Sequence, residues 1–181
     1  MSTPSLPALA RPSTWFVWHE YLITPGVRVL DLACGRGRHS IAAAGRGATV
    51  IALDRDAAKL SDAQAAAGQA GVSIDFRQVD LQAPWPDLGQ FDIVLMFNYL
   101  DRSRIDDVRD RLAPGGVLLM ETYLRAQRDL GWGPQSEEHL LRPGELPGLV
   151  APLDVIHCRE VIEPVDAQTW RAVASVVAQN R

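Results

Sequence analysis

Hydrophobic residues along this chain gather in short runs, separated by segments that mix apolar and polar positions. The runs typical of buried strands are Val27–Leu32, Thr49–Leu53, Ile74–Val79, Phe91–Phe97 and Val117–Thr122. The intervening segments predict helices over His39–Arg46, Asp56–Gln69 and Ser103–Leu112, the last ended by Pro114, Gly115 and Gly116. This alternation indicates a parallel sheet covered by helices on both faces.

The pattern changes after Thr122. Residues 124–148 form a polar stretch with glycine and proline, and the extended segments Val155–Ile162 and Trp170–Val177 are then predicted to pair antiparallel. Residues 1–25 are expected to be a short helical or irregular lead-in. The predicted fold class is therefore α/β, a Rossmann-like doubly wound sheet of seven mostly parallel strands with a C-terminal antiparallel hairpin.

Candidate chemistry concentrates where the first strand ends. Asp31 is followed by Ala33, Cys34 and a glycine turn at Gly35 and Gly37, which opens the first helix. Such a turn brings backbone N–H groups and a helix N-terminus to a ligand. A dinucleotide would place a pyrophosphate against the Asp31 carboxylate, whereas S-adenosylmethionine brings an ammonium and a sulfonium. The acid therefore favours the cationic cofactor.

Two further acids end the second and third strands. Asp54 lies about twenty residues beyond the glycine turn, where its carboxylate can accept hydrogen bonds from the ribose hydroxyls of an adenosine cofactor. Asp80, followed by Leu81, lies where a carboxylate or its neighbouring backbone can meet an adenine edge, although a single strand-end Asp is more often a helix cap. Because open α/β sheets bind ligands at these strand ends, the acids together indicate a nucleotide site.

Composition narrows the functional classes. The 181 residues contain 18 Lys and Arg against 22 Asp and Glu, so the chain lacks the basic excess typical of nucleic-acid binding. Cys34 and Cys158 form no C-x-x-C pair, and the histidines have no metal-ligand spacing, so we expect reduced thiols and no metal. No apolar run has the length of a membrane span, and residues 1–12 lack the order of a secretion signal, which predicts a cytoplasmic protein without a membrane partner.

On these residues the chain resembles the class I S-adenosylmethionine-dependent methyltransferases along nearly its whole length. Val29–Gly37 is similar to their nucleotide loop, Asp54 to their ribose acid, Asp80-Leu81 to their adenine position, Phe91–Val94 to their fourth strand and Leu112–Leu118 to the loop into their fifth. One departure is Ala33, where many members have glycine. A methyl group is expected to be tolerated there if φ is negative.

A narrower resemblance covers four segments. Those that begin at Asp31, Asn98, Glu121 and His139 are similar to a small bacterial branch related to the tellurite-resistance methyltransferases. This resemblance implies a bare catalytic core without a separate substrate domain, and it does not imply tellurite as the substrate. We therefore expect one methyltransferase domain over residues 1–181, with the lead-in at 1–25, the cofactor-binding half at 26–123, and the loop region with the closing hairpin at 124–181.

The strand ends and the resemblance together assign candidate site residues. The cofactor-binding candidates are Asp31, Ala33, Cys34, Gly35, Gly37, Asp54, Arg55, Asp80, Leu81 and Asn98. The catalytic or acceptor-contacting candidates, which follow the fourth and fifth strands, are Tyr99, Arg102, Glu121 and Tyr123. Packing of Tyr99 beneath its loop and pairing of Glu121 with an arginine are the alternatives. Trp15 with Trp18, or residues 127–139, are candidate lids, and core packing is the preferred role of the tryptophans.

These observations predict an enzyme that transfers the methyl group of S-adenosylmethionine to a small-molecule acceptor by in-line displacement, with S-adenosylhomocysteine as the cofactor product. Positioning supplies most of the acceleration, and a base is needed only if the acceptor must lose a proton. A monomer or homodimer is expected, with no nucleic-acid partner. The alternatives are a nicotinamide-dependent oxidoreductase, which the placement of Asp31 opposes, and a non-catalytic module that binds S-adenosylmethionine or S-adenosylhomocysteine.

Overall fold

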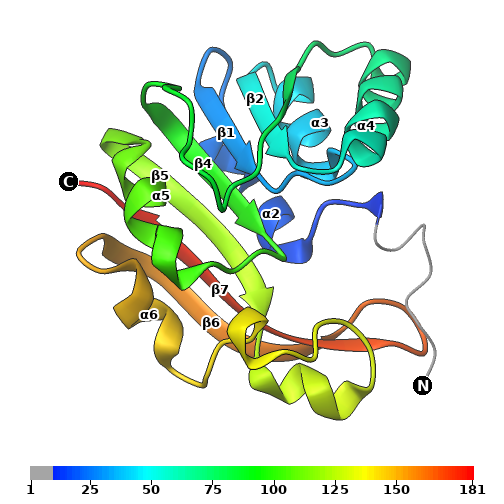
Figure 1. Ribbon diagram of the computed structural model, residues 1–181, viewed down its shortest axis with the longest axis vertical. Helices are drawn as coiled ribbons and strands as arrows, with labels where there is room; N and C mark the ends of the chain where they lie inside the picture. The colour runs from blue at the N-terminus through cyan, green and yellow to red at the C-terminus, as the bar shows by residue number, and fades with distance from the viewer. Residues whose placement is uncertain (1–9) are drawn as a thin grey trace.

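A computed structural model describes residues 10–181 of the chain (Figure 1). Residues 1–9 lie outside the described residues, and with them the start of the predicted lead-in and most of the segment compared with a secretion signal. The strands are β1 (Arg28–Leu32), β2 (Thr49–Asp54), β3 (Asp75–Gln78), β4 (Phe91–Phe97), β5 (Leu112–Tyr123), β6 (Asp154–Pro164) and β7 (Trp170–Gln179).

These strands form a seven-stranded sheet in the order β3-β2-β1-β4-β5-β7-β6. Strands β1 to β5 pair in parallel, whereas β7 runs antiparallel to both β5 and β6. The predicted fold class, including the closing antiparallel pair, is confirmed. Because the strand order reverses beside β1, the carboxyl ends of β1 and β4 flank the point where open α/β sheets bind ligands.

Helices cover both faces of the sheet (Figure 1). They are α2 (Thr14–His19), α3 (Arg38–Gly45), α4 (Ala57–Ala70), α5 (Ile105–Asp110) and α6 (Glu145–Val150), with 3₁₀ turns η1 (Glu20–Leu22), η2 (Arg102–Arg104), η3 (Arg125–Leu130) and η4 (Glu137–His139). Side chains of α2, α3 and α4 pack with one face of the sheet in a single hydrophobic cluster, and those of α5 and α6 pack with the other. Two apolar layers therefore fix the strand ends that carry the site.

The lead-in is helical at α2, and its first tryptophan belongs to the core. Ser13 caps the helix by accepting a hydrogen bond from the Phe16 N–H at 3.2 Å. Trp15 is 4% exposed and its Nε1 donates to the Val176 carbonyl oxygen at 3.3 Å, whereas Trp18 is 57% exposed. Core packing of Trp15 is thus confirmed, while Trp18 lies on the outer side of the same short helix.

Strand β5 differs from its prediction. It begins at Leu112, so the Pro-Gly-Gly segment lies within the strand instead of forming a turn ahead of it. Pairing with β4 shifts between Phe91 and Ile93, and Gly115 has φ +78°. A glycine with positive φ accommodates this irregularity without interrupting the strand. The strand therefore begins at Leu112 and not at Val117, where the sequence predicted its start.

Strand β3 is shorter than expected and is not fully buried. It covers Asp75–Gln78, and its side chains are exposed or half-buried. The reason is its position at the edge of the sheet, where β2 is its one strand neighbour. An apolar run alone does not distinguish an edge strand from a central one.

The polar stretch 124–148 folds into short elements instead of an open loop. Leu141 is fully buried; its N–H donates to the carbonyl oxygen of Tyr123 at the end of β5, and its carbonyl oxygen accepts from the Arg125 N–H. Gln127 is also fully buried, donating to the Trp132 carbonyl oxygen at 3.0 Å and accepting from the Ala172 N–H at 2.8 Å. These contacts attach the segment to the sheet beside the strand ends.

Candidate functional site

A cavity of about 1330 Å³ lies at the carboxyl ends of β1, β2 and β4. Of the fourteen residues predicted for the site, twelve line it: Asp31, Ala33, Cys34, Gly35, Asp54, Arg55, Asp80, Leu81, Asn98, Tyr99, Arg102 and Tyr123. Gly37 and Glu121 lie outside the lining. Since pockets for one small molecule have volumes of about 300–1,000 Å³, this cavity has room for a cofactor and an acceptor together.

The glycine loop is held at both ends by backbone contacts. The Cys34 N–H donates to the Leu53 carbonyl oxygen at 2.9 Å, and Gly37 opens α3 with φ +75°. A side chain at Gly37 would bring its Cβ within 3.1 Å of the Ala63 Cβ on α4. Gly37 therefore allows close packing of the loop on α4, while Gly35, at φ +58°, presents backbone to the cavity.

The condition for a tolerated methyl group at Ala33, a negative φ, is not met. Ala33 has φ +55°, in the left-handed region where glycine is favoured. In L-residues with a Cβ this conformation costs about 1–2 kcal/mol, because the Cβ crowds the following carbonyl oxygen. The loop thus keeps the shape that a glycine would give it, and the methyl group strains the backbone.

We expect Ala33→Gly to raise the free energy of unfolding by about 0.5–1 kcal/mol, since relief of the left-handed strain exceeds the entropy that glycine adds to the unfolded chain. Urea unfolding measures the difference. The matched control is Ala42→Gly inside α3, where the same replacement should lower stability by about 1 kcal/mol. A loss of stability in Ala33→Gly would contradict the strain argument.

Asp54 joins the end of β2 to the glycine loop. It is 7% exposed, and its Oδ2 accepts a hydrogen bond from the Gly35 N–H at 2.7 Å. Its Oδ1 accepts from the Asp56 N–H at 2.9 Å. A carboxylate has about four lone-pair sites, so these two bonds leave it acceptor capacity for ligand hydroxyls.

Asp31 is nearly inaccessible, at 1% exposed, and lies in β1 against the first helix. The Ser40 hydroxyl donates to its Oδ2 at 2.5 Å. Burial raises the pKa of Asp31 to about 7, against the lowering effect of the Ser40 hydrogen bond. The Ser40 side chain, in the first turn of α3, thus has its partner in β1.

The remaining adenosine-side candidates differ in exposure. Asp80 is exposed, and its Oδ1 accepts a hydrogen bond from the Gln82 N–H at 3.0 Å, so it caps a turn as well as lining the cavity. Leu81 is 5% exposed and supplies an apolar wall. Arg55 is exposed at the rim. Burial raises the pKa of the Cys34 thiol, which favours the neutral thiol there.

Asn98 and Tyr99, the two residues that follow β4, both line the cavity. Asn98 has φ +57°, a conformation that asparagine tolerates better than most residues, and its N–H donates to the Glu121 carbonyl oxygen at 2.8 Å. The Tyr99 hydroxyl is buried and has no hydrogen-bond partner within the described chain. Burial raises the pKa of Tyr99 to about 12. The packing alternative requires a hydrogen bond from this hydroxyl to the backbone, and the described residues contain no such bond.

Arg102 has several structural partners although it lines the cavity. Its guanidinium pairs with both carboxylate oxygens of Glu145, at 2.6 and 3.0 Å. It also donates to the carbonyl oxygens of Glu138 and Leu140, at 2.9 Å each. These bonds attach the segment containing η4 and α6 to the end of β4. The acceptor role predicted for Arg102 therefore stays a prediction, competing with this bracing role.

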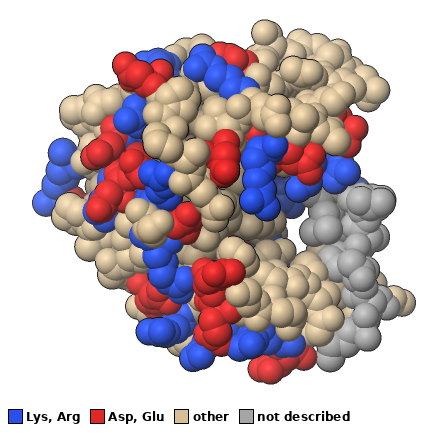
Figure 2. Space-filling model, viewed as in Figure 1, with Lys and Arg blue, Asp and Glu red and all other residues tan. Residues whose placement is uncertain are grey.

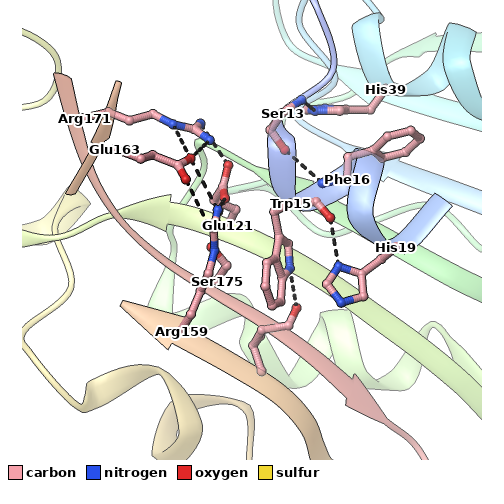
Figure 3. Close-up of polar contacts among 11 residues, drawn as sticks. Ser13, Trp15, Phe16, His19, His39, Glu121, Arg159, Glu163, Arg171 and Ser175 are labelled. Carbon is pink, nitrogen blue, oxygen red and sulfur yellow. Dashed lines mark hydrogen bonds and ion pairs between the residues drawn. The ribbon is translucent and has the colours of Figure 1, made fainter. Parts of the chain in front are cut away.

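Glu121 lies in a buried ion-pair cluster, which we define as Glu121, Arg159, Glu163, Arg171 and Ser175 (Figure 3). Glu121 is 0% exposed and pairs with Arg171 at 2.9 Å and with Arg159 at 3.2 Å. Ser175 donates to the same carboxylate at 2.8 Å. The cluster contains two cations and two anions. Its geometry favours the pairing alternative for Glu121 over contact with an acceptor.

Arg38 and His39, at the start of α3, also line the cavity and were not among the predicted site residues. His39 is 3% exposed, its ring lies 4.0 Å from that of Phe97, and its Nε2 accepts a hydrogen bond from the Ser13 N–H at 3.1 Å (Figure 3). Burial keeps the pKa of His39 well below its usual value. The accepting Nε2 is occupied by the lead-in, so His39 is a packing residue and not a free base. The sequence gives no signal for the contact with Ser13, which lies 26 residues earlier in the chain.

Tyr123, another candidate for acceptor contact, is the last residue of β5. It is 8% exposed, and its ring meets that of Trp132 edge-on with 5.9 Å between centroids. Burial raises its pKa, and the charges of Arg171 and Arg38 act in the opposite direction. The neutral phenol can therefore donate a hydrogen bond into the cavity that it lines.

The surface around the site has mixed charge. On the face drawn in Figure 2, described Lys and Arg side chains alternate with Asp and Glu. Within residues 10–181, His, Cys, Asp and Glu form no group of three or more that could hold a metal ion. No helix in that same range combines the length and apolar character needed to cross a membrane.

Comparison with known proteins places this geometry in a family. Residues 29–116, which contain the glycine loop and all three strand-end acids, match the family described as Methyltransferase domain. A ubiquinone biosynthesis O-methyltransferase of Agrobacterium fabrum is 30% identical over 166 residues, which are 80% of this chain and 66% of that relative. The chain thus spans about two thirds of the length of this relative.

Two solved structures share the fold. TehB from Haemophilus influenzae superposes with a TM-score of 0.79 at 17% identity, over 94% of this chain and 63% of that one. A SAM-dependent methyltransferase from Methanosarcina mazei gives 0.75 at 20% identity, over 94% and 98%. These two likenesses show the shared fold. The matched segment and the relative, on this seven-stranded topology, show that the chain belongs to the class I S-adenosylmethionine-dependent methyltransferases.

Proposed function

We propose that this protein transfers the methyl group of S-adenosylmethionine to a small-molecule acceptor by in-line displacement, in the cytoplasm and as a monomer or homodimer. The observation that carries the proposal is one cavity that joins the glycine loop, Asp31 and Asp54 to the acceptor candidates Tyr99 and Tyr123. In this proposal one domain over residues 1–181 performs the reaction.

The donor set of the cavity fits this cofactor. Asp54 retains acceptor capacity for ribose hydroxyls, and Asp31 is a buried acid beside the place where a ligand ammonium would lie. When bound, S-adenosylmethionine supplies a methyl group on a positively charged sulfur. The side chains have to align the acceptor and exclude water, which the apolar walls at Leu81 and Phe97 support.

The other two candidate functions receive less support. A nicotinamide cofactor would bring its pyrophosphate against the buried Asp31 carboxyl, and family membership opposes this assignment. A non-catalytic module that binds the same cofactor would share every contact on the adenosine side. Turnover is the property that separates that module from an enzyme.

Calorimetric titration of the purified, ligand-stripped protein tests the proposal. We expect saturable binding of S-adenosylmethionine and S-adenosylhomocysteine and no binding of NADH. Release of S-adenosylhomocysteine on addition of one member of a small-acceptor panel would then establish transfer. Binding of NADH alone, or cofactor binding with turnover restricted to proteins or nucleic acids, would overturn the proposal.

Cofactor affinity should rise about tenfold between pH 6 and pH 8. The ligand ammonium favours ionised Asp31, whose pKa in the unliganded protein is about 7, so binding releases a proton and is weaker where the carboxyl is protonated. Titration of S-adenosylhomocysteine in two buffers of different ionisation enthalpy measures that proton. Asp31→Asn should bind more weakly at pH 8 and lose the pH dependence. An unchanged pH profile in this variant would remove Asp31 from the ammonium site.

A further inference from the structure

The turn η4 brings two ionisable side chains, Glu138 and His139, to the cavity lining. The His139 Nε2 lies 3.4 Å from the Glu138 Oε1, and the His139 side chain is 54% exposed. Within residues 10–181 neither nitrogen of this ring has a hydrogen-bond partner. Because Glu138 lies beside Nε2, Nδ1 is the nitrogen that is open to a molecule in the cavity.

The backbone around His139 is fixed although its side chain is exposed. The Arg102 guanidinium donates to the carbonyl oxygens of the residues before and after His139, at 2.9 Å each. The Leu141 N–H donates to the Tyr123 carbonyl oxygen at 2.9 Å. Since Arg102 follows β4 and Tyr123 ends β5, these bonds place His139 by the two strand ends that carry the acceptor candidates.

Other basic groups in the lining already have partners. The Nε2 of His39 accepts the Ser13 N–H, and Asp31 accepts the Ser40 hydroxyl. The other aspartates of the lining each accept a hydrogen bond from the protein: Asp54, Asp62, Asp80 and Asp101. Glu138 remains, but a carboxylate is a weaker base than imidazole, the side chain most often used as a general base.

The apolar residues of the lining indicate the shape of the acceptor. Phe97, Tyr123 and Pro134 belong to the lining, and the Tyr123 ring is met edge-on by Trp132. Such a wall favours a flat apolar ring. A hydroxyl on an aromatic ring is also a much stronger acid than an aliphatic alcohol, so an imidazole can remove its proton during methyl transfer.

Building on the proposed function, we propose that the acceptor is a phenol and that His139 is the catalytic residue that takes its hydroxyl proton. The phenol oxygen forms a bond to the methyl carbon as the carbon–sulfur bond breaks, and sulfur keeps that electron pair. The hydroxyl proton moves to the His139 Nδ1, and Glu138 faces the resulting positive charge. The products are an aryl methyl ether, a neutral thioether and an imidazolium. No oxidant or reductant takes part.

The first test uses the full chain saturated with S-adenosylhomocysteine. Ligand-observed NMR compares two matched pairs of probes, phenol with fluorobenzene and 4-hydroxybenzamide with 4-fluorobenzamide, because fluorine is close to a hydroxyl in size and has no proton to donate. We expect the hydroxyl probe of at least one pair to bind about tenfold more tightly than its partner. His139→Asn should bring that ratio to about one and leave the affinity for S-adenosylhomocysteine unchanged.

The second test gives the tighter-binding phenol to the protein with S-adenosylmethionine and measures the methyl ether. His139→Asn should lower kcat by about 100-fold, more than it changes KM. Glu138→Gln should lower kcat by a smaller factor. The matched control is His157→Asn, an exposed histidine on β6 outside the cavity lining, which should keep the wild-type binding ratio and kcat.

The outcomes separate this proposal from the proposed function. If S-adenosylhomocysteine does not bind, the proposed function fails. If it binds and wild type shows no preference for the hydroxyl probes, or forms no methyl ether, the phenol proposal alone is wrong. If Glu138→Gln abolishes the preference and kcat while His139→Asn keeps them, Glu138 is the base and the assignment to His139 is wrong.

Discussion

Replacing Glu121 with alanine is expected to lower the free energy of unfolding by about 3–5 kcal/mol, because the change leaves two buried arginines without their shared carboxylate. Glu121 is 0% exposed, and Arg171 beside it is 8% exposed. Glu163 pairs with both arginines but leaves one positive charge unbalanced in the cluster once Glu121 is gone. Urea unfolding followed by circular dichroism measures the loss.

Two further variants separate charge from shape. Glu160→Ala, on the same strand as Arg159 and Glu163, removes an exposed carboxylate that accepts the Gly144 N–H, and it should cost less than about 1 kcal/mol. Glu121→Gln keeps an acceptor for the Ser175 hydroxyl while removing the charge, so its loss should lie between those of the other two variants. A Glu121→Ala protein as stable as wild type would show that the cluster contributes nothing to the fold.

The cluster also explains what the sequence could not show about Glu121. Its partners Arg159 and Arg171 are about 40 and 50 residues away, on β6 and β7. No periodicity brings them together before the antiparallel strands are placed beside β5. Pairing with an arginine was an open alternative for Glu121, and only the order of the strands decides which arginines are near.

Other features could be predicted because they depend on local chemistry. A strand that ends in an acid and a glycine turn determines where Asp31 and Asp54 lie, since parallel strands end at one edge of the sheet. The φ of Ala33 could not be obtained in this way. The left-handed conformation there is imposed by the loop's attachment to β2 through Cys34 and Asp54, a tertiary constraint that acts against the preference of alanine.

The short elements and buried contacts within the stretch 124–148 could not be predicted for a related reason. Its polar composition indicates a loop. Two contacts that attach it depend on distant strands: Arg102, just after β4, pairs with Glu145, and the buried Gln127 accepts a hydrogen bond from Ala172 on β7. Polar side chains there satisfy backbone groups of the sheet instead of facing water. The composition of such a segment reflects its many exposed residues, and it does not identify the few buried residues that attach the segment to the sheet.

Asp54→Ala should weaken binding of S-adenosylhomocysteine by about 5- to 150-fold, the equivalent of about 1–3 kcal/mol. The change removes the proposed acceptor of the ribose hydroxyls and also the acceptor of the Gly35 and Asp56 N–H groups. Calorimetric titration gives the affinity. The control is Asp56→Ala, which removes the side-chain cap of α4 and should cost about 1 kcal/mol of stability while leaving affinity unchanged.

A loss of affinity in Asp54→Ala has two possible origins, lost ribose contacts or a loosened glycine loop, and a cycle with deoxyribose analogues of S-adenosylhomocysteine separates them. If Asp54 binds the hydroxyls directly, wild type should lose affinity for the 2′-deoxy or 3′-deoxy analogue, and Asp54→Ala should bind analogue and parent equally. If Asp54 acts only by holding the Gly35 N–H, both proteins should discriminate against the analogues by the same factor. That second result would assign ribose recognition to another group and leave Asp54 as the residue that shapes the loop.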